Sequence, residues 1–436
     1  MRIAMIGGGY VGLVSGACFA EFGVDVALVE ADPARLAALH AGRIPIYEPG
    51  LEHLVAENVA AGRLSFGADL TEAVRGVEAV FIAVGTPRGA DGHADLSHVF
   101  AAVEQVAQAL TGYAVIVTKS TVPVGTGRRL AERLRAVRPD LALDVASNPE
   151  FLREGSAIND FMRPDRVVIG TRSVRAQEVL RRLYRPLYLI EAPILLTDLE
   201  TAELTKYAAN AFLAMKVTFI NEMADLCEKV GADVHDVARG IGLDGRIGRK
   251  FLHPGPGFGG SCFPKDTLAL MHLAQDAGAP SRLVESVVAV NDARKAAMAE
   301  RIIQACGGSV QGKQIAVLGL TFKPETDDMR DAPSIPIVTD LCAAGALVRA
   351  FDPVGAAQAR KVLPQQVEYC RDVMDAATGS DAIVVITEWN EFRAMSPVKL
   401  SQAMRGRVVV DLRNIFDPVA MREAGFAYHG VGRPAA

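Results

Sequence analysis

Short apolar runs alternate with longer stretches of helical periodicity along this chain, and this alternation limits the folds that it can adopt. Runs rich in Val, Ile and Leu are typical of buried parallel strands, and the stretches between them suit crossover helices. In the N-terminal half, the predicted strands are 2–6, 26–29, 79–84, 115–118, 144–146 and 166–169. The chain is therefore predicted to begin with a doubly wound α/β domain.

A second set of predicted strands lies near the C-terminus, at 313–320, 347–351, 382–387 and 408–411. The turn after the first of them reads Gly319-Leu320-Thr321-Phe322 and lacks repeated glycines, so we assign it no dinucleotide. Between the two sets, residues 197–230 contain no Gly or Pro and open with a capping box, Thr197-Asp198-Leu199-Glu200. We expect an α/β protein of two Rossmann-like domains that a long central helix joins.

Composition excludes several classes of function. The 436 residues are 50% hydrophobic and 22% charged, and 46 basic against 51 acidic residues give a net charge of −5. Because the chain has no basic block and no apolar run of about eighteen residues, neither a nucleic-acid surface nor a membrane span is expected. The six cysteines are scattered without a CxxC pair, so we expect no metal site and reduced thiols in a cytoplasm.

A glycine-rich turn follows the first predicted strand and precedes a helical stretch. It reads Gly7-Gly8-Gly9-Tyr10-Val11-Gly12, a GxGxxG pattern. Gly7 permits the tight turn, Gly9 lets the backbone approach a pyrophosphate, and Gly12 allows close helix packing. The alternative is a tight turn that binds nothing.

An acidic residue, Glu30, ends the second predicted strand 23 residues after Gly7. A carboxylate at this place accepts the adenosine ribose hydroxyls and repels a 2′-phosphate, which favours NAD over NADP. Arg35 leaves NADP open as the alternative cofactor, since its guanidinium could bind the 2′-phosphate. The turns 84–87 and 119–123 also follow predicted strands, where they could touch a cofactor or be plain turns.

The segment 148–155 reads NPEFLREG. Asn148 can cap a helix that begins at Pro149, and Glu150 and Glu154 would then lie one turn apart on one face. Two carboxylates that share a site can have their pKa values pushed apart, so that one stays a base. The alternative is the acidic start of a surface helix.

Two further patterns suggest chemistry. Lys206 and Asn210 lie four residues apart in the predicted long helix, where a buried lysine needs an anionic partner unless it extends to solvent. Cys262 follows a glycine-rich loop, and a helix over 266–275 would stabilise its thiolate. A buried, inert cysteine is the alternative.

These segments together resemble the nucleotide-sugar dehydrogenases of the UDP-glucose/GDP-mannose dehydrogenase family. The resemblance runs in order from residue 1 to about residue 417, through GGGYVG, KSTVPVGT, NPEFLREGSAI, KYAANAF, RIGRKFLHPGPGFGGSCFPKD and GLTFKPETDDMRDAPS. It implies an enzyme that oxidises a sugar C6 alcohol to a carboxylate with two NAD+ and releases no aldehyde.

The resemblance also implies the division of the chain and its substrate. The expected parts are an NAD-binding domain (1–196), a central helical dimerisation domain that carries the cysteine loop (197–306) and a C-terminal domain that binds the UDP-sugar (307–436). The RIGRKFL segment favours UDP-glucose over GDP-mannose. A regulatory NAD-binding protein without chemistry is the remaining alternative, and the presence of all the catalytic residue types argues against it.

The catalytic residues that the resemblance implies are Cys262, Lys206, Asn210, Glu150, Asp266 and Thr121. Cys262 would attack the C6 aldehyde to give a thiohemiacetal and, after the second oxidation, a thioester. Lys206 with Asn210 would stabilise the oxyanion, and Glu150 would be the acid/base for thioester hydrolysis. Asp266 and Thr121 would position water and protons.

The residues expected to line the NAD site are Gly7, Gly9, Tyr10, Val11, Gly12, Glu30, Arg35, Thr86, Thr121, Glu154, Lys265 and Arg330. Those expected to contact the sugar nucleotide are Glu150, Phe151, Leu152, Arg153, Glu154, Lys206, Asn210, Arg246, His253, Gly257, Phe258, Gly259, Phe322, Lys323 and Arg413. Arg246 would reach the substrate of a neighbouring subunit, which predicts a homodimer. One departure is Glu30, where the family more often has Asp.

Overall fold

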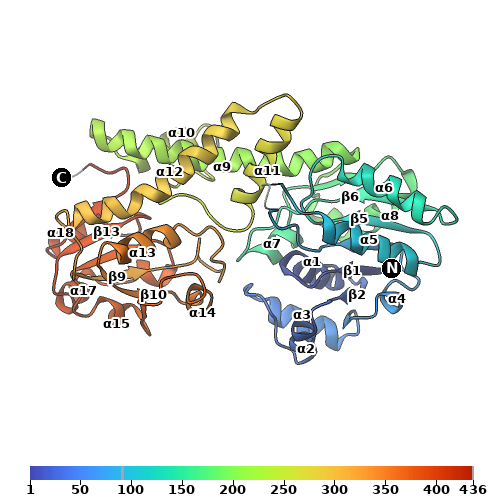
Figure 1. Ribbon diagram of the computed structural model, residues 1–436, viewed down its shortest axis with the longest axis horizontal. Coiled ribbons are helices and arrows are strands. Elements are labelled where there is room, and N and C mark those ends of the chain that lie inside the picture. The colour runs from blue at the N-terminus through green and yellow to red at the C-terminus, as the bar shows by residue number, and fades with distance from the viewer. Residues whose placement is uncertain (90–92, 435–436) are drawn as a thin grey trace. The chain divides into compact units, whose positions relative to one another are not determined.

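The computed structural model describes residues 1–89 and 93–434, which form two compact units (Figure 1). Unit 1 comprises residues 1–209 and 272–277, and unit 2 comprises residues 210–271 and 278–436. Two helices, α9 (Leu199–Val230) and α11 (Phe263–Asp276), contribute residues to both units. No helix within the described ranges is long and apolar enough to cross a membrane.

Unit 1 is built on an eight-stranded sheet with the order β3-β2-β1-β4-β5-β6-β7-β8. Its strands are β1 (Arg2–Ile6), β2 (Asp25–Val29), β3 (Leu64–Gly67), β4 (Ala79–Ile82), β5 (Ala114–Thr118), β6 (Leu143–Ser147), β7 (Val167–Gly170) and β8 (Ile194–Thr197). Neighbouring strands pair in parallel except β6 and β7, which meet at one antiparallel pair. The six predicted strands are confirmed, and the order is that of a doubly wound fold.

Helices cover both faces of this sheet. They are α1 (Tyr10–Glu21), α2 (Pro33–His40), α3 (Leu51–Ala60), α4 (Leu70–Ala73), α5 (Ser97–Ala109), α6 (Thr126–Val137), α7 (Ala157–Met162), α8 (Val174–Leu183) and the 3-10 helix η1 (Arg185–Ile190). Alternate residues of β1 belong to opposite cores: Ile3 and Met5 pack with α1, α3, α7 and α8, and Ala4 and Ile6 pack with α4, α5 and α6. Burial on both faces explains why the central strands are apolar at nearly every position.

Unit 2 contains a second doubly wound sheet, with the order β11-β10-β9-β12-β13-β14 and parallel pairing between the named strands. The strands are β9 (Gln314–Leu318), β10 (Leu347–Phe351), β11 (Glu368–Tyr369), β12 (Ala382–Val385), β13 (Val408–Asp411) and β14 (Ala427–Gly430). The other helices of this unit are α10 (Val234–Gly242), α12 (Arg282–Ala305), α13 (Ser334–Ala343), α14 (Ala356–Ala359), α15 (Val373–Ala377), α16 (Asn390–Arg393), α17 (Pro397–Ala403) and α18 (Pro418–Glu423). The prediction of two Rossmann-like domains is confirmed.

The long central helix is confirmed, but its first turn differs from the predicted capping box. Thr197 pairs with Gly170 at the end of β8, and α9 starts two residues later. The Asp198 carboxylate accepts a hydrogen bond from the Thr201 amide at 2.8 Å, so Asp198 and not Thr197 caps the helix. Pairing at the edge of the sheet takes priority over the local capping signal. The 32 residues of α9 span about 48 Å at 1.5 Å per residue.

Candidate functional site

The glycine-rich turn connects β1 to α1. Gly7 has φ +106°, and a Cβ atom there would lie 2.8 Å from the Ala83 carbonyl oxygen. A Cβ atom at Gly12 would overlap the Gly7 carbonyl, whereas one at Gly9 would meet no atom within 4 Å. Gly9 is also the N-cap of α1 and offers no side chain to its first amides. The turn therefore leaves open space beside unpaired helix amides, an arrangement that fits a pyrophosphate.

Glu30 lies beside this turn, at the end of β2, with only 7% of its surface exposed. Its carboxylate accepts hydrogen bonds from the Gly8 amide at 3.1 Å and from the Asp32 amide at 2.8 Å. Arg35 is half exposed and lies 4.0 Å from Asp32. The turn and the acidic residue are thus held together, as in a site that binds the ribose of NAD.

The turns after β4 and β5 are joined to each other. The Thr86 hydroxyl donates to the Thr121 carbonyl at 3.0 Å, and the Ser120 hydroxyl donates to the Val84 carbonyl at 2.6 Å. Both turns follow the carboxyl ends of neighbouring parallel strands, the edge where ligands bind in such sheets.

The prediction of a helix beginning at Pro149 is wrong. Asn148 does not cap a helix, because its side chain is used elsewhere: Oδ1 accepts from Lys119 Nζ at 3.0 Å and from the Tyr184 hydroxyl at 2.6 Å, and Nδ2 donates to the Val168 carbonyl at 2.8 Å. Residues 148–153 have no regular secondary structure, and α7 begins only at Ala157. The segment that follows β6 is a loop anchored between strands.

Glu150 and Glu154 therefore do not share a helix face. Glu150 is buried, and its carboxylate meets Lys206 Nζ of α9 at 3.0 Å. Their side chains are 5% and 3% exposed, so the lysine does not extend to solvent. Glu150 is the anion that a buried lysine requires.

Cys262 lies at the start of α11. Its carbonyl accepts the first helical hydrogen bond, from the Asp266 amide at 2.9 Å, so Cys262 occupies the N-cap position. The predicted helix after the cysteine is confirmed, and it begins three residues earlier than expected. The thiol is partly exposed and lies 3.4 Å from the Ser261 hydroxyl. A helix N-terminus favours the thiolate form.

Asp266, one turn further along α11, is almost completely buried. Its carboxylate accepts from Asn210 Nδ2 at 2.6 Å and from Lys265 Nζ at 2.6 Å. The structure thus joins two of the predicted catalytic residues, Asn210 and Asp266, directly.

The glycine-rich loop before Cys262 packs closely against segments that follow strands β9 and β13 of unit 2. A Cβ atom at Gly255 would lie 2.9 Å from Arg413 Nη1, and one at Gly260 would lie 2.7 Å from the Phe322 ring. The Gly260 amide donates to the Arg330 carbonyl at 2.8 Å. Three residues predicted to contact ligands therefore surround this loop, and its glycines are needed for that approach.

The remaining predicted residues occupy varied surroundings. Phe151 lies under the Arg166 guanidinium, 3.5 Å from the ring centroid, and Arg153 pairs with Asp160. Arg246 is 90% exposed and bonded to Asp244. Unit 1 holds Gly7, Gly9, Tyr10, Val11, Gly12, Glu30, Arg35, Thr86, Thr121, Glu150, Phe151, Leu152, Arg153, Glu154 and Lys206. Unit 2 holds Asn210, Arg246, His253, Gly257, Phe258, Gly259, Cys262, Lys265, Asp266, Phe322, Lys323, Arg330 and Arg413.

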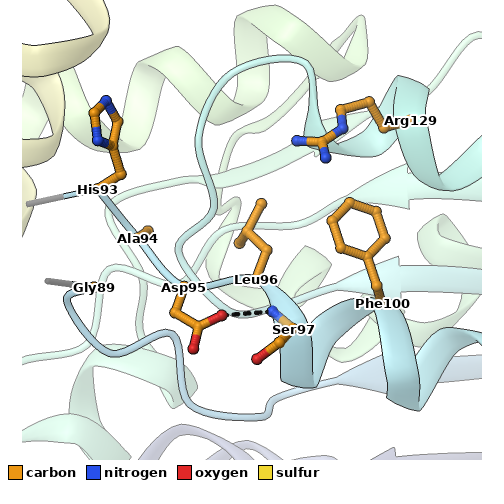
Figure 2. Close-up of a pocket in the computed structure, with 8 residues that line it drawn as sticks. All are labelled: Gly89, His93, Ala94, Asp95, Leu96, Ser97, Phe100 and Arg129. Carbon is orange, nitrogen blue, oxygen red and sulfur yellow. Dashed lines mark hydrogen bonds between the residues drawn. The ribbon is translucent and has the colours of Figure 1, made fainter. Parts of the chain in front are cut away.

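Unit 1 contains a cavity of about 660 Å³, and Figure 2 shows the residues that line it. Its lining includes His93, Asp95, Phe100 and Arg129, and the Asp95 carboxylate caps the start of α5 by accepting from the Ser97 amide at 2.8 Å. None of the predicted site residues lines it.

Three domain models of one protein family match this chain. Residues 1–188 match the NAD binding domain of the UDP-glucose/GDP-mannose dehydrogenase family, residues 200–293 match its central domain, and residues 316–418 match its UDP binding domain. The chain belongs to this dehydrogenase family.

Full-length relatives agree with this assignment. The chain is 59% identical over 437 aligned residues to a UDP-glucose 6-dehydrogenase of Rhizobium meliloti (strain 1021), with 100% of both chains covered. It is 48% identical to UDP-glucose 6-dehydrogenase TuaD of Bacillus subtilis (strain 168), over 100% of this chain and 94% of the relative. The structure of a UDP-glucose dehydrogenase from Pyrobaculum islandicum superposes with a TM-score of 0.91 at 39% identity, covering 99% and 98% of the two chains.

Membership of the dehydrogenase family assigns NAD as the cofactor of the N-terminal domain, and the turn at Gly9 and the carboxylate of Glu30 fit it. The second sheet differs at the equivalent place. Asp352, which follows β10, accepts from the Leu320 and Thr321 amides and from Trp389 Nε1. Its other oxygen accepts from the Val354 and Gly355 amides, so donors of the protein itself engage both oxygens of this carboxylate.

Sequence reasoning missed Glu48. This buried carboxylate accepts from the Gly155 amide at 2.6 Å and the Ala157 amide at 2.7 Å, and it also bonds the Tyr10 hydroxyl. It therefore ties the glycine-rich turn to the loop that follows Glu150. No local pattern predicts these contacts, because Tyr10 lies 38 residues away in the chain and the two amides lie 107 and 109 residues away.

Sequence reasoning also missed Lys119. The lysine is buried beneath the loop that carries Glu150, where it donates to Asn148 and to the Tyr184 hydroxyl at 3.2 Å. Burial lowers the pKa of Lys119 to about 8. A lysine that ends an apolar strand was the only available signal, and it did not distinguish a buried side chain from an exposed one.

Proposed function

We propose that this chain is a UDP-glucose 6-dehydrogenase, which oxidises C6 of UDP-glucose to the carboxylate of UDP-glucuronate and reduces two NAD+. The observation that carries the proposal is the partly exposed thiol of Cys262 at the N-cap of α11. The thiol ends a glycine loop that packs against Arg413 and Phe322. A cationic side chain beside such a loop suits a nucleoside diphosphate.

The proposed reaction has two oxidations and one hydrolysis. NAD+, when bound, accepts a hydride from C6 in each oxidation. After the first, the Cys262 thiolate adds to the aldehyde carbon, and the thiohemiacetal then loses its C6 hydride and hydroxyl proton to become a thioester. Water cleaves the C–S bond, which gives the acid and restores the thiol. Covalent capture explains why no aldehyde would be released.

The chain supplies charge and proton transfer for these steps. Lys206 and Asn210 stabilise the C6 oxyanion, which forms when the alcohol or the thiohemiacetal is deprotonated. Glu150 acts as acid and base in hydrolysis, and Asp266 and Thr121 position water and protons. The ion pair between Lys206 and Glu150 supports this division, because a charge that is already desolvated and paired needs little reorganisation.

The ligand contacts follow the predicted sets. NAD lies along residues 7–12, Glu30, the joined turns after β4 and β5, and the residues Glu154, Lys265 and Arg330. The sugar nucleotide lies against residues 150–154, the loop 253–259 and the side chains of Phe322, Lys323 and Arg413. The 90% exposure of the Arg246 side chain supports a role across a dimer interface, at the substrate of the other subunit.

The wider assignments are also proposals. We propose an NAD-binding domain (1–196), a central dimerisation domain (197–306) and a C-terminal UDP-sugar domain (307–436). We further propose a cytoplasmic location, because the thiol chemistry requires reduced cysteines and all six cysteines are present as thiols. We also propose that the protein is a homodimer.

The test is NADH formation with UDP-glucose, with GDP-mannose and without a sugar nucleotide. We expect NADH only with UDP-glucose, at two NADH for each molecule consumed. Turnover of GDP-mannose alone would overturn the substrate assignment. Absence of turnover with either sugar would instead support an NAD-binding regulatory protein.

A further inference from the structure

Side chains that the proposed mechanism does not use form hydrogen bonds with the backbone of the loop that precedes Cys262. Asn291 of α12 accepts from the Phe258 amide at 2.8 Å through Oδ1 and donates to the Phe258 carbonyl at 3.1 Å through Nδ2. Both hydrogen-bonding groups of one loop residue are thus paired with a single side-chain amide. Asn291 is 4% exposed, so water does not readily replace either bond.

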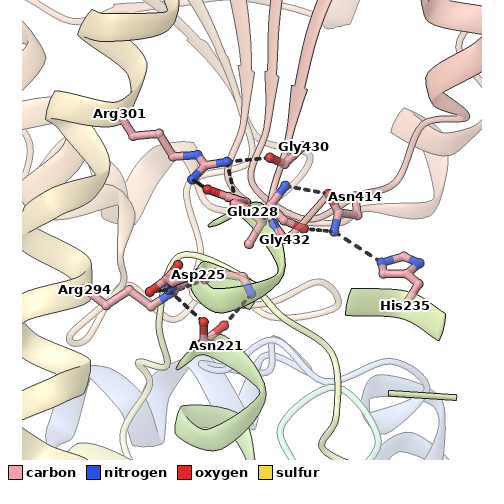
Figure 3. A network of polar contacts seen from close by, with 11 residues as sticks. Asn221, Asp225, Glu228, His235, Arg294, Arg301, Asn414, Gly430 and Gly432 are labelled. Atoms are coloured by element: carbon pink, nitrogen blue, oxygen red, sulfur yellow. Dashed lines mark hydrogen bonds and ion pairs between the residues drawn. The ribbon is translucent and has the colours of Figure 1, made fainter. Parts of the chain in front are cut away.

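A second anchor holds the same loop three residues earlier, at Gly255. Its amide donates to Asn221 Oδ1 of α9 at 2.8 Å, and its carbonyl accepts from Arg294 Nε of α12 at 2.7 Å. Arg294 is itself fixed, because Nη1 donates to both carboxylate oxygens of Asp225 at 2.8 and 2.9 Å. Figure 3 shows Asn221, Asp225 and Arg294 gathered where α9 and α12 approach each other.

The same loop also contacts residues proposed to bind the nucleotide. Gly255 faces Arg413 and Gly260 faces Phe322 at distances that leave no room for a side chain. The loop backbone therefore contacts both the supporting side chains of α9 and α12 and the proposed ligand-binding residues. A shift of the support moves the loop relative to Arg413 and Phe322.

The support also connects to the thiol. The Phe258 side chain packs with Ala214 and Val287, and its ring meets Phe263 edge-on at 5.9 Å. Phe263 is the first residue of α11 and directly follows Cys262. The residue that Asn291 holds by its backbone thus contacts the helical turn that presents the thiol.

We infer that Asn291, Arg294 and Asn221 are positioning residues, which fix the 253–260 backbone so that it binds the uridine diphosphate part of the substrate. This inference rests on the proposed function and adds to it a support that touches neither substrate nor cofactor. Because the amides and carbonyls involved are buried, loss of one partner leaves an unsatisfied group, and the loop must shift to reach water. A displacement of about 1 Å can reduce turnover by about a hundredfold.

The test uses the full chain and UDP as the probe, since binding of UDP needs no turnover. The variants are Asn291→Leu, which removes both bonds at similar volume, and Asn221→Ala. Asn221→Asp is the conservative variant, because it keeps an acceptor for the Gly255 amide. Gln304→Leu is the matched control, as Gln304 is an exposed residue on the same helix α12.

We expect the dissociation constant for UDP and the KM for UDP-glucose to rise at least tenfold in Asn291→Leu and Asn221→Ala, while the KM for NAD+ changes less than twofold. Asn221→Asp should return the UDP constant to within about threefold of the wild type, and Gln304→Leu should match the wild type. Thermal unfolding identifies the folded variants. If Asn291→Leu does not fold, the UDP dissociation constants of Asn221→Ala and of the conservative variant Asn221→Asp test the inference.

Folded variants with wild-type UDP binding, or an equal rise in both KM values, would overturn the inference. So would a wild-type chain that does not bind UDP. A wild type that binds UDP but forms no NADH from UDP-glucose would overturn the proposed reaction instead, and the UDP measurements would still decide the role of the support.

Discussion

The buried pair Lys206–Glu150 gives the most quantitative prediction for unit 1. The two charged atoms are 3.0 Å apart, with side chains 3% and 5% exposed. With an effective dielectric constant of about 20, their Coulomb attraction is about 5.5 kcal/mol. Desolvation offsets several kcal/mol for each ion, so the intact pair contributes little net stability. Removing one partner has a different result, because the other charge stays buried but loses this ion pair.

We expect Lys206→Met and Glu150→Gln each to lower the free energy of unfolding by about 3–5 kcal/mol. The double variant should be more stable than the sum of the two losses predicts, by about 2 kcal/mol or more, because neither charge of the pair remains to be desolvated. Arg133→Met is the control, since Arg133 forms an exposed ion pair with Glu104 and should cost less than about 1 kcal/mol.

The assay is urea unfolding at pH 7 without ligands. Because two units can unfold separately, hydrogen exchange in peptides from β5 and β6 assigns the transition of unit 1. A loss below about 1 kcal/mol for Lys206→Met, or strict additivity in the double variant, would refute the reasoning, because either result means that the lysine is not held as a desolvated charge.

Three other predictions concern unit 1 and the thiol. The first concerns Lys119: between pH 8 and 10.5, the free energy of unfolding of the wild type should rise relative to that of Lys119→Met by at most about 3 kcal/mol. The reason is that the buried lysine, with its pKa of about 8, loses its proton in the folded state while the unfolded chain keeps it. Urea midpoints that run parallel for the two proteins across this pH range would contradict this prediction. Gly12→Ala should lower the melting temperature because its methyl group overlaps the Gly7 carbonyl, whereas Gly9→Ala should keep the melting temperature and raise the KM for NAD+; equal melting temperatures would argue against the turn geometry. Cys262→Ser should still bind NAD+ and UDP-glucose but fail to complete the oxidation, and acid formation at the wild-type rate, measured by chromatography, would be inconsistent with covalent capture.

Sequence reasoning predicted the features that depend on local patterns. The buried strands β1, β4 and β5 are apolar at nearly every position, so their runs were recognised, and the glycines of the first turn follow directly from backbone sterics. A helix over 266–275 was considered for the segment after Cys262, and the structure has one there that starts at Phe263. Strands β3, β8, β11 and β14 were not predicted. Strand β11 is only two residues long, and the four-residue strands β3 and β14 are each interrupted by a polar residue, Ser65 and His429.

The features that were missed or wrong depend on long-range contacts. Asn148 followed by proline is a good capping signal, yet Lys119 and Tyr184 occupy its side chain from distant parts of unit 1. The partner of Lys206 was expected to be anionic but could not be named, because Glu150 lies 56 residues earlier. The support by Asn291 likewise has no signal on α12, where an asparagine in a helix is ordinarily a solvated residue.

The central claim is that Cys262 carries the sugar as a thioester between the second oxidation and hydrolysis. Intact-mass and peptide-mass measurements on a Glu150→Gln variant, quenched in acid after mixing with UDP-glucose and NAD+, test it most directly, because this variant should slow hydrolysis. We predict a UDP-glucuronyl adduct on the peptide that contains Cys262. An unmodified Cys262 peptide while NADH accumulates, or an aldehyde released into solution, would contradict the claim.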